Sequence, residues 1–129
     1  MSGKERFRLR VRSDFSASHF LRDFGGKCES LHGHNFGVEV EIEGDKLDPK
    51  VEFLVDFGEI KRELSRVMDY LDHNHLNELA PFDRINPTSE NLARFIFERM
   101  APWAGKAGLK LCSVTVSEND RQSATYLEG

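Results

Sequence analysis

The sequence has little of several features that mark whole classes of protein. Its 129 residues include no apolar run near the length of a membrane-spanning helix, and residues 1–6 lack the apolar core of a secretory signal peptide. It has no long basic run, and its formal net charge is −4, which disfavours binding to a nucleic-acid backbone. We therefore expect a cytoplasmic protein that binds neither membranes nor nucleic acid.

Cysteine is also scarce. The chain has two cysteines, Cys28 and Cys112, far apart in the sequence. In a reducing cytosol two such thiols are expected to stay free rather than to form a disulfide. Hydrophobic residues make up 39% and charged residues 31%, which is an ordinary balance for a globular protein. The length fits one domain, 1–129.

Two predicted strands each have histidine at one end. Apolar residues alternate with arginine from Phe7 onward, and the same alternation continues to His19. A second alternation, centred on Val38, reaches back to His34 and His32. Alternate residues of a strand share a face, so we expect all three histidines on the core side of their strands, just beyond the apolar rows.

The remaining elements are two helices and two strands. The helices are predicted to begin at capping residues near 56 and 88, and the strands to cover 109–118 and 124–127. In the first of these strands Cys112 and Glu118 are expected to share the core face with two valines. The order strand, strand, helix, helix, strand, strand predicts an α+β fold.

The segment from Cys28 to His34 holds the strongest chemical signal. It places a thiol four residues before His32, and His32 and His34 share a strand face where His19 could join them. Three imidazole ligands with one open position are typical of a catalytic zinc site, and a nearby thiol would act in proton transfer or as a nucleophile. A closed structural zinc site with Cys28 as fourth ligand is an alternative, as are histidines without a metal.

The motif Cys28-x-x-x-His32-Gly33-His34 resembles the signature of the 6-pyruvoyltetrahydropterin synthase / 6-carboxytetrahydropterin synthase family. Further matching segments follow in the family's order: Phe15 to His19, Val55 to Phe57, Leu71 to Asn77, Asn86 to Leu92 and Val116 to Glu118. The resemblance implies a tunnelling fold, in which a four-stranded antiparallel sheet has two helices on one face. It also implies a barrel-forming homo-oligomer, a hexamer, with its sites at subunit interfaces.

The resemblance implies a metal and a catalytic group. Zn²⁺ would be held by His19, His32 and His34. Cys28 would abstract a proton, with Asp72 and His73 as its partners in proton transfer. Without the resemblance, Asp72 and His73 would be a helix end and an exposed histidine.

The resemblance also implies a binding pocket for a pterin triphosphate. Glu118 would anchor the pterin ring, and Thr88, Ser89 and Glu90 would line the pocket. An internal salt bridge is the alternative role for Glu118, and helix capping alone would explain Thr88 or Ser89. Lys27 and Arg22 are candidates for binding the triphosphate.

The three-residue spacer before His32 resembles the bacterial 6-carboxytetrahydropterin synthase of queuosine biosynthesis. That zinc-dependent carbon–carbon lyase converts 7,8-dihydroneopterin triphosphate to 6-carboxytetrahydropterin and releases acetaldehyde and triphosphate. Glu29 follows Cys28 directly and is either a loop carboxylate or a second base; a second base there would favour a folate-type paralogue that forms 6-hydroxymethyldihydropterin, and we expect the carboxy product over this alternative. A 6-pyruvoyl product, and a non-catalytic zinc-stabilised pterin-binding module, are further alternatives.

Overall fold

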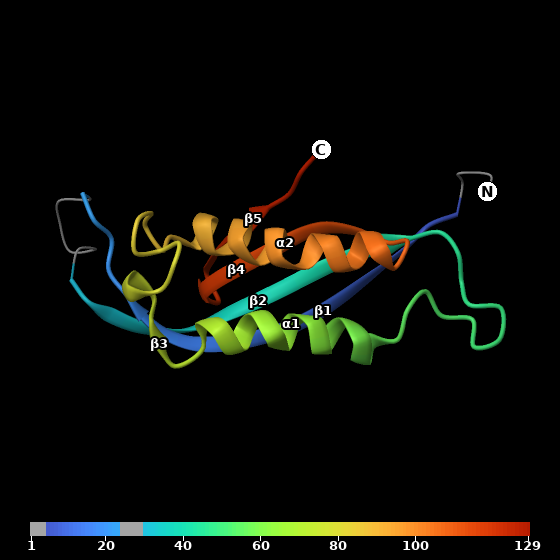
Figure 1. Ribbon diagram of the computed structural model, residues 1–129, viewed down its shortest axis with the longest axis horizontal. Helices are drawn as coiled ribbons and strands as arrows, with labels where there is room; N and C mark the ends of the chain where they lie inside the picture. The colour runs from blue at the N-terminus through green and yellow to red at the C-terminus, as the bar shows by residue number, and fades with distance from the viewer. Residues whose placement is uncertain (1–4, 24–29) are drawn as a thin grey trace.

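The computed structural model describes residues 5–23 and 30–129, and it shows one sheet with both helices on the same side (Figure 1). The elements in chain order are β1 (Phe7–His19), β2 (His32–Gly44), α1 (Phe57–Leu71), β3 (Asn74–His75), the short 3-10 helix η2 (Leu76–Glu78), α2 (Ser89–Lys106), β4 (Lys110–Asn119) and β5 (Gln122–Tyr126). This arrangement confirms the predicted α+β class. In the part of the chain that the structure describes, no helix is long and apolar enough to cross a membrane.

The two long strands pair in one continuous antiparallel register. It runs from Phe7 opposite Gly44 to His19 opposite His32. Because the pairing is unbroken, the alternation of buried and outward residues continues to the ends of both strands. His19, at the end of β1, is only 2% exposed. The prediction that the core face of both strands extends to the histidines is confirmed.

Within residues 5–23 and 30–129 the sheet has five strands, in the order β3-β1-β2-β4-β5, rather than the four expected. The additional strand, β3, is two residues long and pairs in parallel with Ala17 and Ser18 of β1. A hydrogen bond of 2.6 Å from the His73 amide to the Ser16 carbonyl leads the chain into this pairing. A two-residue strand is too short to show an alternation of apolar residues, so the sequence pattern did not reveal it.

The pairing of β2 with β4 contains a bulge. Two consecutive residues of β2 pair with Leu111 and Ser113, so Cys112 is skipped. Leu111 is buried in the core, whereas Cys112 is half-buried. The prediction that Cys112 shares the core face of β4 is therefore wrong, because one extra residue in a strand reverses its alternation.

Both helices begin at the predicted caps and cover the same apolar sheet face. The Asp56 carboxylate accepts a hydrogen bond of 2.8 Å from the Gly58 amide at the start of α1. The Thr88 hydroxyl accepts one of 3.0 Å from the Asn91 amide at the start of α2. The helix residues that enter the core are Ile60, Leu64, Val67, Met68, Leu71, Leu92, Ala93, Phe95, Ile96, Phe97, Met100 and Ala104. The core therefore lies between the helices and one face of the sheet.

Candidate metal centre

Three imidazoles converge at the edge of this core. His19 and His32 are direct cross-strand partners. His34 is opposite Ala17, two residues nearer the core than His32 and on the same face of the sheet. The ring centroids of His19 and His32 are 4.6 Å apart, and those of His32 and His34 are 4.7 Å apart. The continuous register of β1 and β2 therefore brings together residues that are thirteen or more positions apart in the sequence.

Two backbone carbonyls orient the outer pair of rings. His19 Nδ1 lies 2.8 Å from the Pro87 carbonyl oxygen, and His32 Nδ1 lies 2.7 Å from the Ser30 carbonyl oxygen. A carbonyl can only accept, so each Nδ1 must donate its proton. Each neutral ring then has its lone pair on Nε2, the tautomer that a metal-binding imidazole needs.

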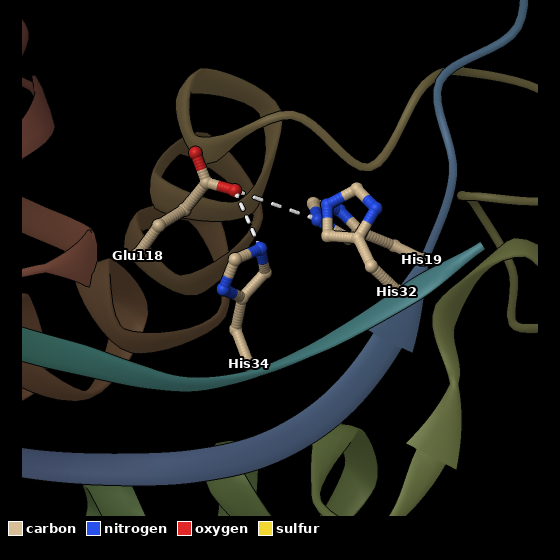
Figure 2. A group of neighbouring side chains, drawn as sticks. All are labelled: His19, His32, His34 and Glu118. Carbon is tan, nitrogen blue, oxygen red and sulfur yellow. Dashed lines mark ion pairs between the residues drawn. The ribbon is translucent and has the colours of Figure 1, made fainter. Parts of the chain in front are cut away.

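Glu118 of β4 completes the group. Its Oε2 lies 3.1 Å from His34 Nε2 and 3.5 Å from His19 Nε2, and Figure 2 shows these two imidazoles and the carboxylate facing one another. The four residues each present one ligand atom, and these atoms lie within 4.8 Å of one another. Sequence alternation placed Glu118 on the core face but did not indicate its contact with the histidines. That contact depends on how β4 lies beside β2.

The donor set fits a zinc-type ion. The Nε2 atoms of His19 and His34 are buried, and neither has a partner in hydrogen-bonding geometry among the described residues, despite the nearby carboxylate. Burial also lowers the pKa of His19 below the usual 6.5, which keeps the ring neutral and able to bind a metal. Neutral imidazoles and a carboxylate are common zinc ligands. The group could therefore hold a metal ion.

A cavity of about 520 Å³ opens beside these ligands. It is lined by His19, His32 and Glu118, and also by Thr88, Ser89 and Glu90, the residues predicted to line a binding pocket. Thr88 is the α2 cap as well, so capping accounts for its hydroxyl, whereas the Ser89 side chain does not cap the helix. The structure thus places all three next to the candidate metal ligands.

Asp72 and His73 contact each other but lie elsewhere. Asp72 Oδ2 is 2.8 Å from His73 Nδ1, and Asp72 Oδ1 accepts a hydrogen bond of 2.7 Å from the Ser16 amide. The Ser16 amide and, to a lesser extent, His73 lower the pKa of the Asp72 carboxyl. The His73 side chain is 82% exposed, and its φ is 57°, a left-handed value that a non-glycine residue rarely adopts. Neither residue is among those that line the cavity.

Arg22 lies beside the cavity, but its guanidinium is already engaged. It donates to the Phe82 carbonyl at 2.7 Å, the Ile85 carbonyl at 3.1 Å and the Asn77 carbonyl at 3.4 Å. Its backbone amide and carbonyl both bond to the Asn86 side chain. Arg22 therefore holds the end of β1 against residues 77–86, which leaves few donors for a phosphate.

Three residues with predicted roles in the site lie outside the described part of the chain. They are Lys27, Cys28 and Glu29. No role was predicted for Asn77, whose buried side-chain amide forms hydrogen bonds with both the amide and the carbonyl of Phe20, at 2.9 and 3.0 Å. Asn77 falls inside one of the motif segments, and that was the signal available for it.

The chain matches the family model described as 6-pyruvoyl tetrahydropterin synthase over residues 8–129. It is 36% identical over 116 residues to 6-carboxy-5,6,7,8-tetrahydropterin synthase of Synechocystis, which covers 87% of this chain and 86% of that protein. It is 37% identical over 93 residues to dihydroneopterin monophosphate aldolase of Pyrococcus furiosus, covering 72% and 74%. The solved structure of 6-pyruvoyl tetrahydropterin synthase of Caenorhabditis elegans superposes with a TM-score of 0.84 at 28% identity, covering 96% of each chain. The chain belongs to the 6-pyruvoyl tetrahydropterin synthase family.

Proposed function

We propose that the protein is a zinc-dependent lyase that converts 7,8-dihydroneopterin triphosphate to 6-carboxytetrahydropterin, releasing acetaldehyde and triphosphate. The observation that supports this best is the convergence of three imidazoles, two of them held in a metal-binding tautomer, beside a cavity of about 520 Å³. Relatives named 6-carboxytetrahydropterin synthase favour this product. The resemblance of the Cys28 to His34 motif favours a place in queuosine biosynthesis.

Different residues of the chain bind the metal and transfer protons. Zinc on His19, His32 and His34 would supply Lewis acidity toward the side-chain oxygens of the substrate. The thiol of Cys28, as thiolate, takes a proton from the carbon beside those oxygens. Asp72 orients the imidazole of His73, which passes protons to and from the reacting group.

Glu118 and the α2 N-terminus form the binding part of the site. The Glu118 carboxylate accepts hydrogen bonds from a ring N–H and the 2-amino group of the pterin. Ser89 and Glu90, at the first turn of α2, line the same cavity as the imidazoles and would contact the ring. The fit of a pterin is supported by the polar side chains that line this cavity of about 520 Å³.

The separation of Asp72 and His73 from the cavity favours a site shared between subunits. The His73 ring, 82% exposed, can reach the cavity of a neighbouring chain. We infer that the protein works as a homo-oligomer, a barrel-forming hexamer, in which one subunit supplies the metal ligands and Cys28 and another supplies the dyad.

A second product is favoured by a specific feature. Glu29 follows Cys28, and the Pyrococcus furiosus relative is named an aldolase. With Glu29 as base, the same site would release 6-hydroxymethyldihydropterin for folate synthesis. A 6-pyruvoyl product and a non-catalytic pterin-binding module are the remaining alternatives.

The test is to incubate the zinc-loaded protein with 7,8-dihydroneopterin triphosphate and identify the products by mass spectrometry. We expect 6-carboxytetrahydropterin with acetaldehyde, and a 6-hydroxymethyl product would overturn this assignment in favour of the folate-type reaction. Cys28→Ala should abolish the carboxy product while zinc and pterin still bind, and Glu29→Gln, the matched control, should retain it. Normal turnover by Cys28→Ala would remove Cys28 from the mechanism.

A further inference from the structure

The position of the Glu118 carboxylate matches a metal ligand as well as a substrate contact. Its Oε2 lies 3.1 Å from His34 Nε2 and 3.5 Å from His19 Nε2, and among the described residues these two buried nitrogens have no partner in hydrogen-bonding geometry (Figure 2). With zinc–ligand bonds of about 2.0–2.1 Å, neighbouring ligand atoms of a tetrahedral ion lie about 3.3 Å apart. The two separations are thus those expected across one ion that both imidazoles and the carboxylate bind.

The backbone at Glu118 explains how its carboxylate reaches the imidazoles. The pairing of β4 with β2 ends at Ser117, opposite Gly37. On the other side of β4, the pairing with β5 shifts register between Ser117 and Asn119, so that Glu118 is skipped. Glu118 keeps the core-face parity of Val114 and Val116, so its side chain points from β4 toward the imidazoles. As the residue that the bulge skips, it has no cross-strand partner in the described sheet that would restrict its side chain.

The carboxylate also lies at the boundary between two cavities. Glu118, Ser89 and Glu90 line both the cavity of about 520 Å³ beside the imidazoles and a second one of about 170 Å³. The second cavity extends along β5, where it is lined by Gln122, Ser123 and Ala124. The Glu118 side chain is 24% exposed. It has space on the side away from the histidines into which it can turn.

We propose that Glu118 is the fourth metal ligand in the substrate-free protein, and that binding of the pterin ring draws its carboxylate off the metal. Glu118 then has two successive partners, first the ion beside His19 and His34 and later the ring. Withdrawal of the carboxylate frees the coordination position only when the ring is in place. This inference rests on the proposed metal-dependent pterin function and adds a residue that opens the metal to its substrate.

The experiment uses cobalt-substituted protein, with azide as a probe of an open coordination position. Wild-type protein should bind azide weakly, because azide must displace the carboxylate. Glu118→Gln should bind azide at least about tenfold more tightly, and its zinc affinity, measured by competition with a chelator, should fall by about tenfold or more. The two affinities change in opposite directions, which a general loss of folding would not produce.

Asp23→Asn is the matched control, because it removes an equal charge from the same cavity but not from the ligand group. Both affinities should stay within about threefold of wild type, whereas equal effects of the two variants would assign the change to net charge and overturn the proposal. If Glu118→Gln does not fold, Glu118→Asp keeps the charge but shortens the reach, and it should shift both affinities in the same directions. Unchanged affinities in a folded Glu118 variant would also overturn the proposal.

A pterin ring without a side chain tests whether the Glu118 carboxylate moves from the metal to the ring, the exchange of partners proposed above. Addition of this ring to wild-type protein should raise azide affinity toward that of Glu118→Gln and should leave Glu118→Gln unchanged. No change in the wild type would overturn the exchange. These failures differ from a failure of the proposed function: a wild-type protein that takes up neither zinc nor cobalt would refute the metal-dependent reaction itself, and the fourth ligand with it.

Discussion

His19 shows how a single residue depends on both local pattern and distant contacts. Strand alternation places its ring toward the core, where it is 2% exposed. The Pro87 carbonyl, 68 positions along the chain, then decides which nitrogen has the proton. Alternation is a local property of the backbone, so it could be predicted, whereas the carbonyl partner could not. The tautomer of His19 is therefore set by the tertiary structure.

Burial of His19 predicts that the metal-free protein loses stability in mild acid. The folded-state pKa of His19 lies below 6.5, so the unfolded chain binds more protons at this position as the pH falls below that value. The free energy of unfolding should therefore decrease as the pH is lowered from about 7 through the unfolded pKa, until the folded imidazole is also protonated. Urea unfolding of metal-free protein between pH 5 and 8 measures this decrease.

His19→Gln is the comparison that isolates this effect, because it removes the His19 imidazole and leaves the four other histidines of the chain in place. The variant should show a shallower dependence on pH over this window. Parallel profiles for the two proteins would show that His19 does not contribute.

Asp72 offers a second prediction about one residue. Its carboxylate fixes the exposed His73 ring at 2.8 Å, and the Ser16 amide holds the pKa of Asp72 low, so the group stays charged at neutral pH. Asp72→Asn should lower kcat by about 10²- to 10⁴-fold without changing the zinc content. Asp69→Asn is the control: Asp69 is an exposed carboxylate in α1, the helix that Asp72 caps, and its substitution should leave kcat unchanged. Equal kcat values for Asp72→Asn and wild type would remove the dyad from the reaction.

The connection between α1 and α2 is the element that holds the end of β1 in place. Asn77 in η2 makes two reciprocal hydrogen bonds to Phe20, directly after His19. Arg22 and Asn86 extend the contact by hydrogen bonds between residues about sixty positions apart. The sequence predicted the helices on each side of this segment from their caps and apolar spacing. These hydrogen bonds from Asn77, Arg22 and Asn86, which together form a clamp on the end of β1, follow no periodic sequence pattern. Only the folded chain revealed them.

Asn77→Ala should destabilise the protein by about 1–3 kcal/mol, because it leaves the amide and carbonyl of Phe20 without their partner. Zinc affinity should fall as well, because the clamp adjoins His19. Glu78→Ala, at an exposed position of the same short helix, should change the free energy of unfolding by less than about 0.5 kcal/mol. Urea unfolding of both variants, followed by chelator competition, checks the two effects. A stable Asn77→Ala with normal zinc affinity would show that the clamp is dispensable.

At the scale of the whole molecule, the arrangement of one chain separates two predicted parts of the site. The imidazoles, Glu118 and the first turn of α2 surround one cavity, whereas Asp72 and His73 are not among its lining residues. The sequence motifs placed both parts in one chain but did not indicate whether they meet within it. If the proposed reaction is right, a neighbouring subunit must supply the dyad.

Subunit mixing tests this inference. Cys28→Ala and His73→Ala should each be inactive alone, yet oligomers reassembled from equal amounts should recover about a quarter of wild-type activity, because about one site in four takes an intact half from each variant. Mixing Cys28→Ala with His34→Ala, which both alter the metal side, should recover none. Absence of recovery in the first mixture, with oligomers of mixed composition shown by native mass spectrometry, would place the whole site within one chain.

The sequence alone determined which faces of the strands and helices are apolar, where both helices begin, and that three histidines share a face with Glu118 on another strand. These properties follow from alternation, helical spacing and capping, all of which act over a few neighbouring residues. The tertiary structure decided the pairing of His19 with His32, the bulge that turns Cys112 from the core, the placement of β4 that brings Glu118 to the imidazoles, and the absence of Asp72 from the residues that line the described cavity. Those features depend on contacts between segments far apart in the chain, and a local pattern contains no information about which segments meet.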